Sequence, residues 1–151
     1  MAHTIILGYD GSECAKEALE VAIGLAREAT GSTIVVVHGV EVNLSLGGGP
    51  MAAELMVPEL QEVELPAEAA ARCVLDEAAA LIADAGVQAE SSLERTAPFA
   101  ALLDAAKARN ADMIVVGNHG TGAIRGALLG STAYKLLHHS TIPVVVVPHR
   151  H

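Results

Sequence analysis

The sequence predicts an open α/β fold in which one parallel sheet of five strands is covered by helices on both faces. Short runs of apolar residues recur at 4–8, 33–40, 113–116 and 144–147, and they are continuously apolar, as in strands buried on both faces. Helical patterns lie between these runs, and strictly alternating strands and helices form a parallel sheet with right-handed crossovers. A chain of 151 residues is expected to form a single domain, residues 1–151.

The first strand and the first helix are separated by a short polar turn. Residues 4–8 form the strand, and Asp10, Gly11 and Ser12 supply turn and capping chemistry before the helix. Gly31 closes this helix, and residues 33–40 form the second strand. The helix has one apolar face of residues at three- and four-residue steps: Ala15, Ala18, Leu19, Ala22, Ile23 and Ala26.

The middle of the chain begins with a loop rich in Gly and Pro at residues 43–66. A helix follows over residues 67–85 and ends at Gly86, and a weaker alternating strand at 87–94 is typical of a sheet edge. Thr96 is expected to cap a helix that begins near Pro98. The inner face of the first helix is expected to hold Val74, Leu75, Ala78, Leu81, Ile82 and Ala85, and that of the second Phe99, Leu102, Leu103 and Ala106.

The last third of the chain joins a buried strand to a glycine-rich segment, MIVVGNHGTGAIRGALLGS, at residues 113–131. Its glycines stand at positions 117, 120, 122, 126 and 130. Because glycine has no Cβ, it allows positive φ and close backbone approach, so that successive N–H groups can converge on an anion. Ser131 opens a helix that extends to about His139, and a helix N-terminus favours phosphate.

Two well-known phosphate-binding motifs do not fit this segment. A Walker A loop ends in GK[ST], but no lysine precedes Lys135 here. A dinucleotide fingerprint needs GxGxxG at the first strand-to-helix turn, and this segment misses that spacing and lies near the other end of the chain. The remaining pattern, G-x2-G-x9-G-S, resembles the ATP-binding motif of the universal stress protein family.

The resemblance extends over nearly the whole chain. IILGYDGSECAKEAL resembles the opening strand, turn and helix of that family, VVVVHGVEV its second strand, and HSTIPVVVVP its closing strand. Only residues 43–65 match nothing in it. The resemblance implies an adenine nucleotide alpha hydrolase-like fold with strand order 3-2-1-4-5, and it implies a nucleotide-binding crevice between the first and fourth strands.

The same resemblance implies contacts for the nucleoside. Asp10 matches an aspartate beside the ribose and adenine, although a turn or cap residue is the alternative, and both are compatible if Ser12 is the cap. Tyr9 matches a position whose backbone lines the adenine pocket, and a buried core tyrosine is its alternative. Val37, His38, Gly39 and Val40 end the second strand, where family members contact adenine through the backbone. Gly39 is expected to widen the pocket.

Further contacts are implied for the ribose and phosphates. Val116 and Gly117 match positions that flank the base and ribose, while Asn118 and His119 lie within the loop. Arg125 is a candidate for the β- or γ-phosphate, with a solvated loop arginine as the alternative. Mg²⁺ bound mainly by phosphate oxygens and water is the expected partner of ATP. The implied phosphate cradle consists of Gly117, Gly120, Gly130, Ser131 and Thr132.

Composition restricts the function. A formal charge of −9 argues against nucleic-acid binding, and only 2% aromatic residues leave almost no platform on which a base could stack. Neither a signal peptide nor an apolar run near the ~20 residues of a membrane span is present, which predicts a cytoplasmic protein without membrane contact. The histidines do not form a metal-binding pattern, and Cys14 and Cys73 are expected to be packing residues.

Assembly and function follow as expectations. The apolar run that starts at Ile142 and ends at Val147 lies at a sheet edge in the implied order, so a homodimer through this strand is expected. Near the cradle only Asp10, His119 and Arg125 could serve hydrolysis, and they form no recognisable catalytic set. An ATP-binding regulatory protein is therefore favoured over a binder of cAMP or another adenylate, and over a weak ATP-hydrolysing enzyme.

Overall fold

The computed structural model describes residues 1–41, 66–120 and 129–150, and their strands form one parallel sheet. The order is β3-β2-β1-β4-β5, which confirms the order implied by the resemblance. Every neighbouring pair is parallel. The strands are β1 (Thr4–Gly8), β2 (Thr33–Gly39), β3 (Gln88–Glu94), β4 (Met113–Gly117) and β5 (Val144–Val147).

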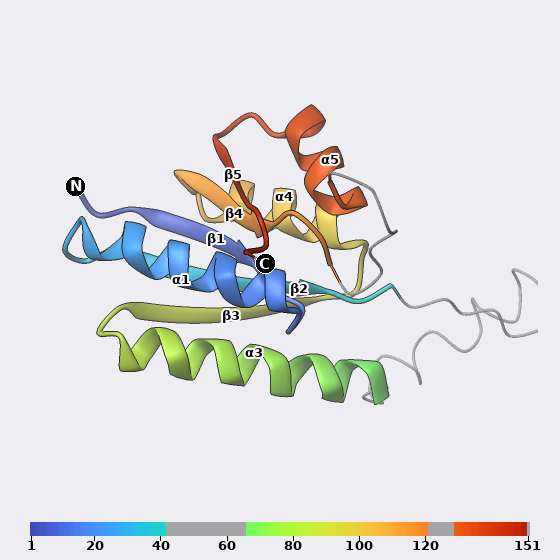
Figure 1. The fold of residues 1–151 in the computed structure, drawn as a ribbon, viewed down its shortest axis with the longest axis horizontal. Helices are drawn as coiled ribbons and strands as arrows, with labels where there is room; N and C mark the ends of the chain where they lie inside the picture. The colour runs from blue at the N-terminus through green and yellow to red at the C-terminus, as the bar shows by residue number, and fades with distance from the viewer. Residues whose placement is uncertain (42–65, 121–128, 151) are drawn as a thin grey trace, which may run out of the picture.

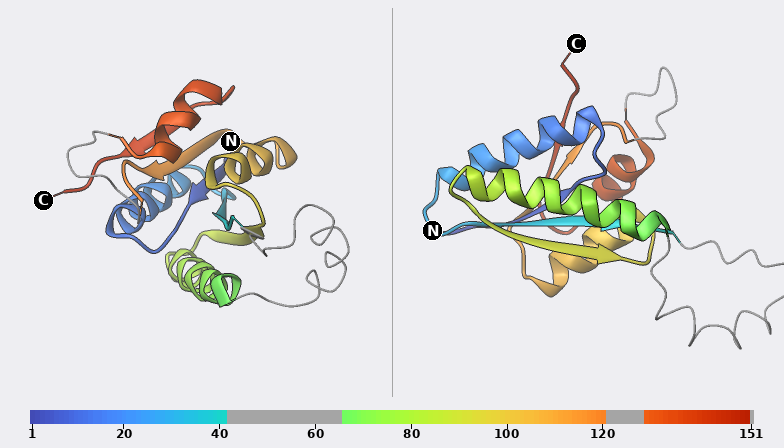
Figure 2. Two further views of the ribbon diagram at one scale, coloured as in Figure 1. Left: turned by 90° about the vertical axis from the view of Figure 1, so that its right-hand side faces the viewer. Right: turned by 90° about the horizontal axis from the view of Figure 1, so that it is seen from below.

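Helices cover both faces of this sheet, as the alternating pattern predicts (Figures 1 and 2). One face carries α1 (Glu13–Arg27) and α3 (Pro66–Asp84), and the other carries α4 (Pro98–Ala108) and α5 (Ser131–His139). Each face has its own hydrophobic core, since successive residues of the central strands alternate between them. Ile5 and Leu7 of β1 belong to the α1/α3 core, whereas Ile6 belongs to the α4/α5 core.

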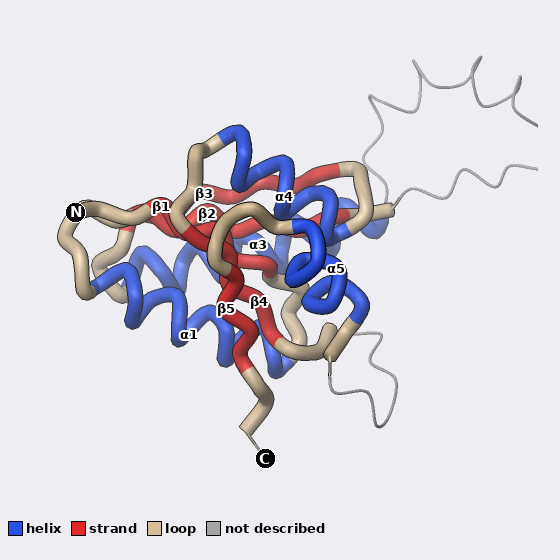
Figure 3. The backbone as a smooth tube through the Cα atoms, turned by 90° about the horizontal axis from the view of Figure 1, so that it is seen from above, coloured by secondary structure: helices blue, strands red, loops and turns tan. Residues whose placement is uncertain are grey.

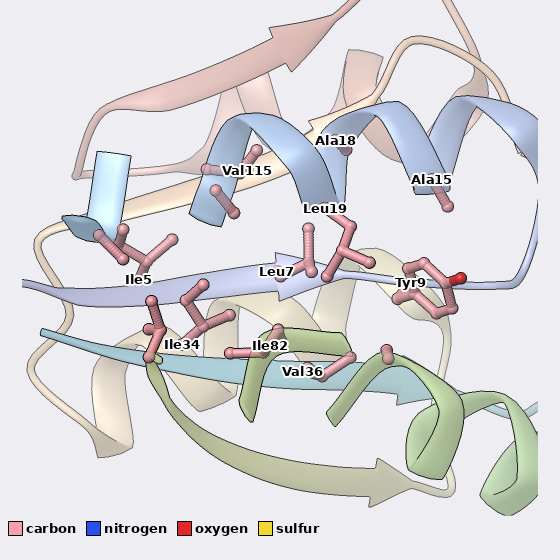
Figure 4. Close-up of a cluster of buried hydrophobic side chains, with 14 of the residues drawn as sticks. Ile5, Leu7, Tyr9, Ala15, Ala18, Leu19, Ile34, Val36, Ile82 and Val115 are labelled. Carbon is pink, nitrogen blue, oxygen red and sulfur yellow. The ribbon is translucent and has the colours of Figure 1, made fainter. Parts of the chain in front are cut away.

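The α1/α3 core is aliphatic and closely packed (Figure 4). Alanines 15, 18 and 22 of α1 are buried at helical spacing, and their small side chains let the helix lie near the sheet. Leu7 and Val36 are fully buried beneath it, and the Tyr9 ring fills the end of the same core. The Tyr9 side chain is therefore a core residue, which was the alternative to a residue of the adenine pocket.

The buried face of α3 differs from the expected one. Leu81 is 44% exposed, and Ala85 lies beyond the helix. The helix packs mainly on β3 at the edge of the sheet, so only a narrow stripe is covered. The buried stripe starts at Glu68 rather than Val74, nearly two turns earlier than expected, and consists of Glu68, Ala71, Leu75, Ala78 and Ile82.

The start of α4 also differs from the prediction. Thr96 is not the cap: Ala97 holds that position, and no side chain caps the helix there. Pro98 at the first helical position lacks an N–H, so one fewer donor needs a partner. The backbone of Thr96 instead packs against the end of β2, where its carbonyl oxygen would lie 2.7 Å from a Cβ on Gly39.

The strand order brings the two unusual turns together. β1 pairs with both β2 and β4, so the turn at residues 9–12 lies beside the loop that follows β4. Figure 3 shows these connections gathered at one edge of the sheet, near the N-terminal ends of α1 and α5. Among the described residues, no helix is both long enough and apolar enough to cross a membrane.

Candidate functional site

A cavity of about 340 Å³ lies at the carboxyl ends of β1, β2 and β4, where ligands bind in open parallel sheets. It is bordered by the first turns of α4 and α5 and by the described residues that follow β1 and β4. Thirteen of the residues implied by the resemblance line it: Tyr9, Asp10, Val37, His38, Gly39, Val116, Gly117, Asn118, His119, Gly120, Gly130, Ser131 and Thr132.

The inner wall of the cavity is aliphatic. Val37, Leu102 and Val116 belong to the α4/α5 core and reach the cavity from three different elements. Gly8 permits this packing, because a Cβ there would lie 2.9 Å from Cγ1 of Val116 and 3.1 Å from Cδ1 of Leu102. An apolar hollow with polar groups at its rim is typical of small-molecule sites. It suits a flat ring that slides between side chains rather than stacking on an aromatic one.

The carboxylate of Asp10 stands at the corner between the β1 turn and the glycine-rich loop. Its Oδ1 accepts a hydrogen bond of 2.9 Å from the N–H of Ser12. Its Oδ2 lies against Gly120, where a Cβ would come within 2.9 Å of it. Ser12 is the N-cap of α1, since its Oγ accepts from the N–H of Ala15 at 3.2 Å. Asp10 is thus not needed as the helix cap.

The glycines of the loop act through close approach. None of Gly117, Gly120 and Gly130 has positive φ, so of the two properties that glycine allows, these three use close backbone approach. A Cβ on Gly117 would lie 2.8 Å from the backbone carbon of Cys14, so glycine lets β4 meet the start of α1. A Cβ on Gly130 would lie 3.2 Å from the carbonyl oxygen of Asn118, and the N–H of Gly130 donates to that same oxygen.

The N-terminus of α5 faces the cavity. Gly130 is its N-cap and has no side chain that could accept from the first N–H groups of the helix. Ser131, Thr132 and Ala133 form this first turn and line the cavity. Uncapped helix N–H groups and the positive end of the helix dipole favour an anion at this point.

Two histidines border the cavity in different ways. His38 lies 2.7 Å through Nδ1 from the carbonyl oxygen of Tyr9, which only accepts, so Nδ1 carries the proton and Nε2 is the acceptor. The Nδ1 atom of His119 is buried and has no hydrogen-bond partner among the described residues. A ligand with a polar group nearby would satisfy it.

Two of the implied residues, Val40 and Gly39, are placed differently from the expectation, and a third is not described. Val40 does not line the cavity. Its backbone N–H already donates to the Glu94 carbonyl oxygen at 2.8 Å. Arg125 lies outside the described residues. Gly39 lines the cavity but does not widen it, since the space where a Cβ would stand is occupied by the backbone of residues 96–98.

A sequence model of the Universal stress protein family matches residues 1–148. The chain belongs to this family. A universal stress protein of Thermus aquaticus, from a QAH/OAS sulfhydrylase 3' region, is 36% identical to this chain over 148 residues. The match covers 97% of this chain and 99% of the Thermus protein. A solved universal stress protein in complex with cAMP has a TM-score of 0.68 at 27% identity, over 96% of both chains. An Archaeoglobus fulgidus universal stress protein in complex with dAMP has a TM-score of 0.69 at 21% identity, over 97% of this chain and 98% of that one.

Some lining residues of this universal stress protein were not among the implied contacts. Those from α4 and α5 are apolar and gave no sign of a site, because core positions have the same pattern. The additional lining residues are Gly8, Ala15, Pro98, Leu102, Leu129 and Ala133.

Proposed function

We propose that this universal stress protein binds ATP, with the adenine in the aliphatic part of the cavity and the phosphates at the N-terminus of α5. The observation that carries the proposal is the first turn of α5. It follows an N-cap residue without a side chain, Gly130, and borders the cavity through three residues. Backbone N–H groups bind phosphate without basic side chains, which suits a protein of formal charge −9.

The nucleoside has partners of fitting chemistry at the other end of the cavity. Val37, Leu102 and Val116 offer an apolar slot for a purine, and Asp10 offers a carboxylate to a ribose hydroxyl or an amine. The related structures in complex with cAMP and dAMP support an adenylate ligand, since both compounds contain adenine.

Mg²⁺ is proposed to accompany the phosphates. In the described part of the chain, no three His, Cys, Asp or Glu residues are grouped so that they could hold a metal ion. Mg²⁺ takes most of its ligands from phosphate oxygens and water, and the Asp10 carboxylate, which lies against Gly120, could supply one more.

The test is calorimetry with ATP, ADP, AMP and cAMP. We expect affinity to increase with the number of phosphates, because each additional one can reach N–H groups of α5 or the loop. Gly120→Val and Gly130→Val should abolish ATP binding while circular dichroism stays native. Gly24→Val is the matched control, since a Cβ on Gly24 meets nothing within 4 Å. Wild-type protein that binds none of the four compounds would contradict the proposal.

Binding of cAMP is the second candidate, favoured by the related cAMP complex. A cyclic monophosphate would use the adenine slot and the nearest N–H groups but not the far part of the loop. Equal or tighter binding of cAMP than of ATP would select this candidate. ATP hydrolysis remains a third possibility, which a single-turnover assay with labelled ATP would detect.

We also propose that the protein is a homodimer through β5. β5 pairs only with β4 in the described sheet. The carbonyl oxygen of Pro143, just before β5, accepts from the N–H of Ile114 and therefore points toward β4. Because N–H directions alternate along a strand, those of Val144 and Val146 face the open edge. Light scattering should give twice the chain mass, and Val146→Pro should give a monomer by removing one edge donor. A monomeric wild type would contradict this.

A further inference from the structure

Asn118 uses its backbone N–H, its backbone carbonyl and its side-chain oxygen in three hydrogen bonds that link two parts of the molecule. Its N–H donates to the Val147 carbonyl oxygen at 2.9 Å, and its Oδ1 accepts from the N–H of His149 at 3.3 Å. Its own carbonyl oxygen accepts from the N–H of Gly130, the N-cap of α5. One residue at the edge of the cavity therefore joins the chain after β5 to the start of α5.

The chain after β5 is held on its other side by Glu17 of α1. The carboxylate lies 2.8 Å from Nδ1 of His149, which must donate because the ionised carboxylate only accepts. It also accepts from the N–H of Arg150, at 3.1 Å to Oε1 and 3.0 Å to Oε2. Such bonds to a charged group are stronger than neutral ones. The half-buried Glu17 thus fixes residues 149–150 on α1.

These contacts form a closed series that begins and ends on α1 and includes Gly117 of the cradle. Gly117 rests on the backbone of Cys14, which precedes Glu17 by one turn of α1. Asn118 then contacts residues 147 and 149, and these lead to Glu17 on the same helix. Figure 3 shows the chain leaving β5 close to the N-terminal end of α1. Glu17 itself does not line the cavity.

We propose that Glu17 and Asn118 are positioning residues for the phosphate cradle. Glu17 seats residues 149–150 on α1, and Asn118 transmits that position to the N–H of Gly130 and hence to the first turn of α5. The proposal rests on the proposed function, since it concerns the phosphate-binding part of that site. It makes the segment after β5 a regulator of nucleotide affinity, because a partner or ligand that displaces residues 149–150 from Glu17 would loosen the cradle.

Glu17→Ala gives a test in which the sign of the effect decides. Removing an anion from a protein of charge −9 should strengthen ATP binding if only long-range electrostatics matter. The proposal predicts the opposite, a loss of about threefold to tenfold in ATP affinity, as expected for one hydrogen bond. Glu20→Ala is the matched control, because Glu20 is exposed on the same helix and carries the same charge.

The experiment compares ATP with adenosine by calorimetry. Adenosine does not reach the cradle, so its affinity should be unchanged in Glu17→Ala, whose side chain lies outside the cavity. The double variant with Glu17→Ala and Asn118→Ala should lose no more ATP affinity than the stronger single variant, because both act through the same contact. Glu17→Gln keeps an acceptor for the N–H of Arg150, so it should lose less ATP affinity than Glu17→Ala. It takes the place of Glu17→Ala in the experiment if that variant does not fold.

The outcomes separate the two proposals. If wild-type protein binds neither ATP nor adenosine, the proposed function fails. If wild-type protein binds ATP and the Glu17 variants bind it equally well or more tightly, only the positioning proposal is overturned. Equal losses for ATP and adenosine would overturn it as well, since they would indicate general damage to the cavity.

Discussion

The carboxylate of Asp10 lies against Gly120, so that a Cβ on this glycine would stand 2.9 Å from Oδ2. Asp10 comes from the turn after β1 and Gly120 from the loop after β4, and 110 positions of sequence separate them. Their meeting explains why both turns border one cavity. It also places a carboxylate at the cavity, where the proposed nucleotide would offer a ribose hydroxyl.

Asp10→Asn should weaken adenosine binding by about tenfold or more, because a hydrogen bond to a charged acceptor contributes about 1.5–3 kcal/mol. The substitution keeps an oxygen for the N–H of Ser12, so the turn should persist. Calorimetry measures the affinity and circular dichroism the fold. Ser12→Ala is the control: it removes the α1 cap, which costs about 1 kcal/mol of stability, and should leave adenosine affinity unchanged. Undiminished binding by Asp10→Asn would rule out a contact of its carboxylate with the nucleoside.

Gly117→Ala should destabilise the protein by about 1–3 kcal/mol, because the new methyl group overlaps the backbone of Cys14 and pushes α1 away from β4. Urea denaturation measures this change. Gly24→Ala, in the exposed middle of α1, should instead stabilise by up to about 1 kcal/mol, since alanine favours a helix more than glycine and nothing lies within 4 Å of the new atom. If both variants were equally stable, close approach at Gly117 would not be its function.

The fold could be predicted because its main signals are local. Four continuous apolar runs and the glycines and prolines between them locate the strands and helices, with bounds that shift by one or two residues. Strand order came from the family resemblance, because composition and periodicity do not say which strands are neighbours. Where the cavity lies then followed, since parallel strands bring their carboxyl ends to one edge.

Contacts that depend on distant parts of the chain could not be predicted. Glu68 in the first turn of a helix has the pattern of a solvated residue that complements the helix dipole, yet it is 2% exposed because Arg95, 27 positions later, pairs with it. Asn118 was predicted to lie within the loop at the nucleotide site and it lines the cavity, but nothing in the sequence indicated that its Oδ1 accepts from the backbone N–H of His149. The bend of the chain that brings residue 149 there is a tertiary feature without a sequence signal.

Arg95→Met should destabilise the protein by about 3 kcal/mol, because it leaves the Glu68 carboxylate buried without its partner. The guanidinium contacts that carboxylate twice, with Nε 2.6 Å from Oε1 and Nη2 3.2 Å from Oε2. Because Arg95 is 41% exposed, we place the effect at the low end of the range for buried pairs. Arg109→Met, which breaks an exposed pair with Glu90, should cost less than about 1 kcal/mol. Urea denaturation compares the two, and equal losses would contradict the assigned burial.

Tyr9→Phe should change how stability depends on alkaline pH. The Tyr9 side chain is 2% exposed, and none of the residues that the structure describes gives its hydroxyl a hydrogen-bond partner. Burial raises the pKa of this hydroxyl above the ordinary value of 10.0, and the charge of Glu77 raises it further. Because the unfolded chain ionises first, the stability from the neutral form is complete below pH 10 and is lost as pH rises through the folded pKa.

The slope of this loss is at most about 1.4 kcal/mol per pH unit, and it should be absent from Tyr9→Phe. At pH 7 the variant should be as stable as wild type or more stable, since it removes a buried hydroxyl that no described residue satisfies. Urea denaturation between pH 7 and 11 measures both effects, with Tyr134→Phe on the exposed face of α5 as the control. A Tyr9→Phe protein that loses stability above pH 10 as steeply as wild type would show that ionisation elsewhere dominates there.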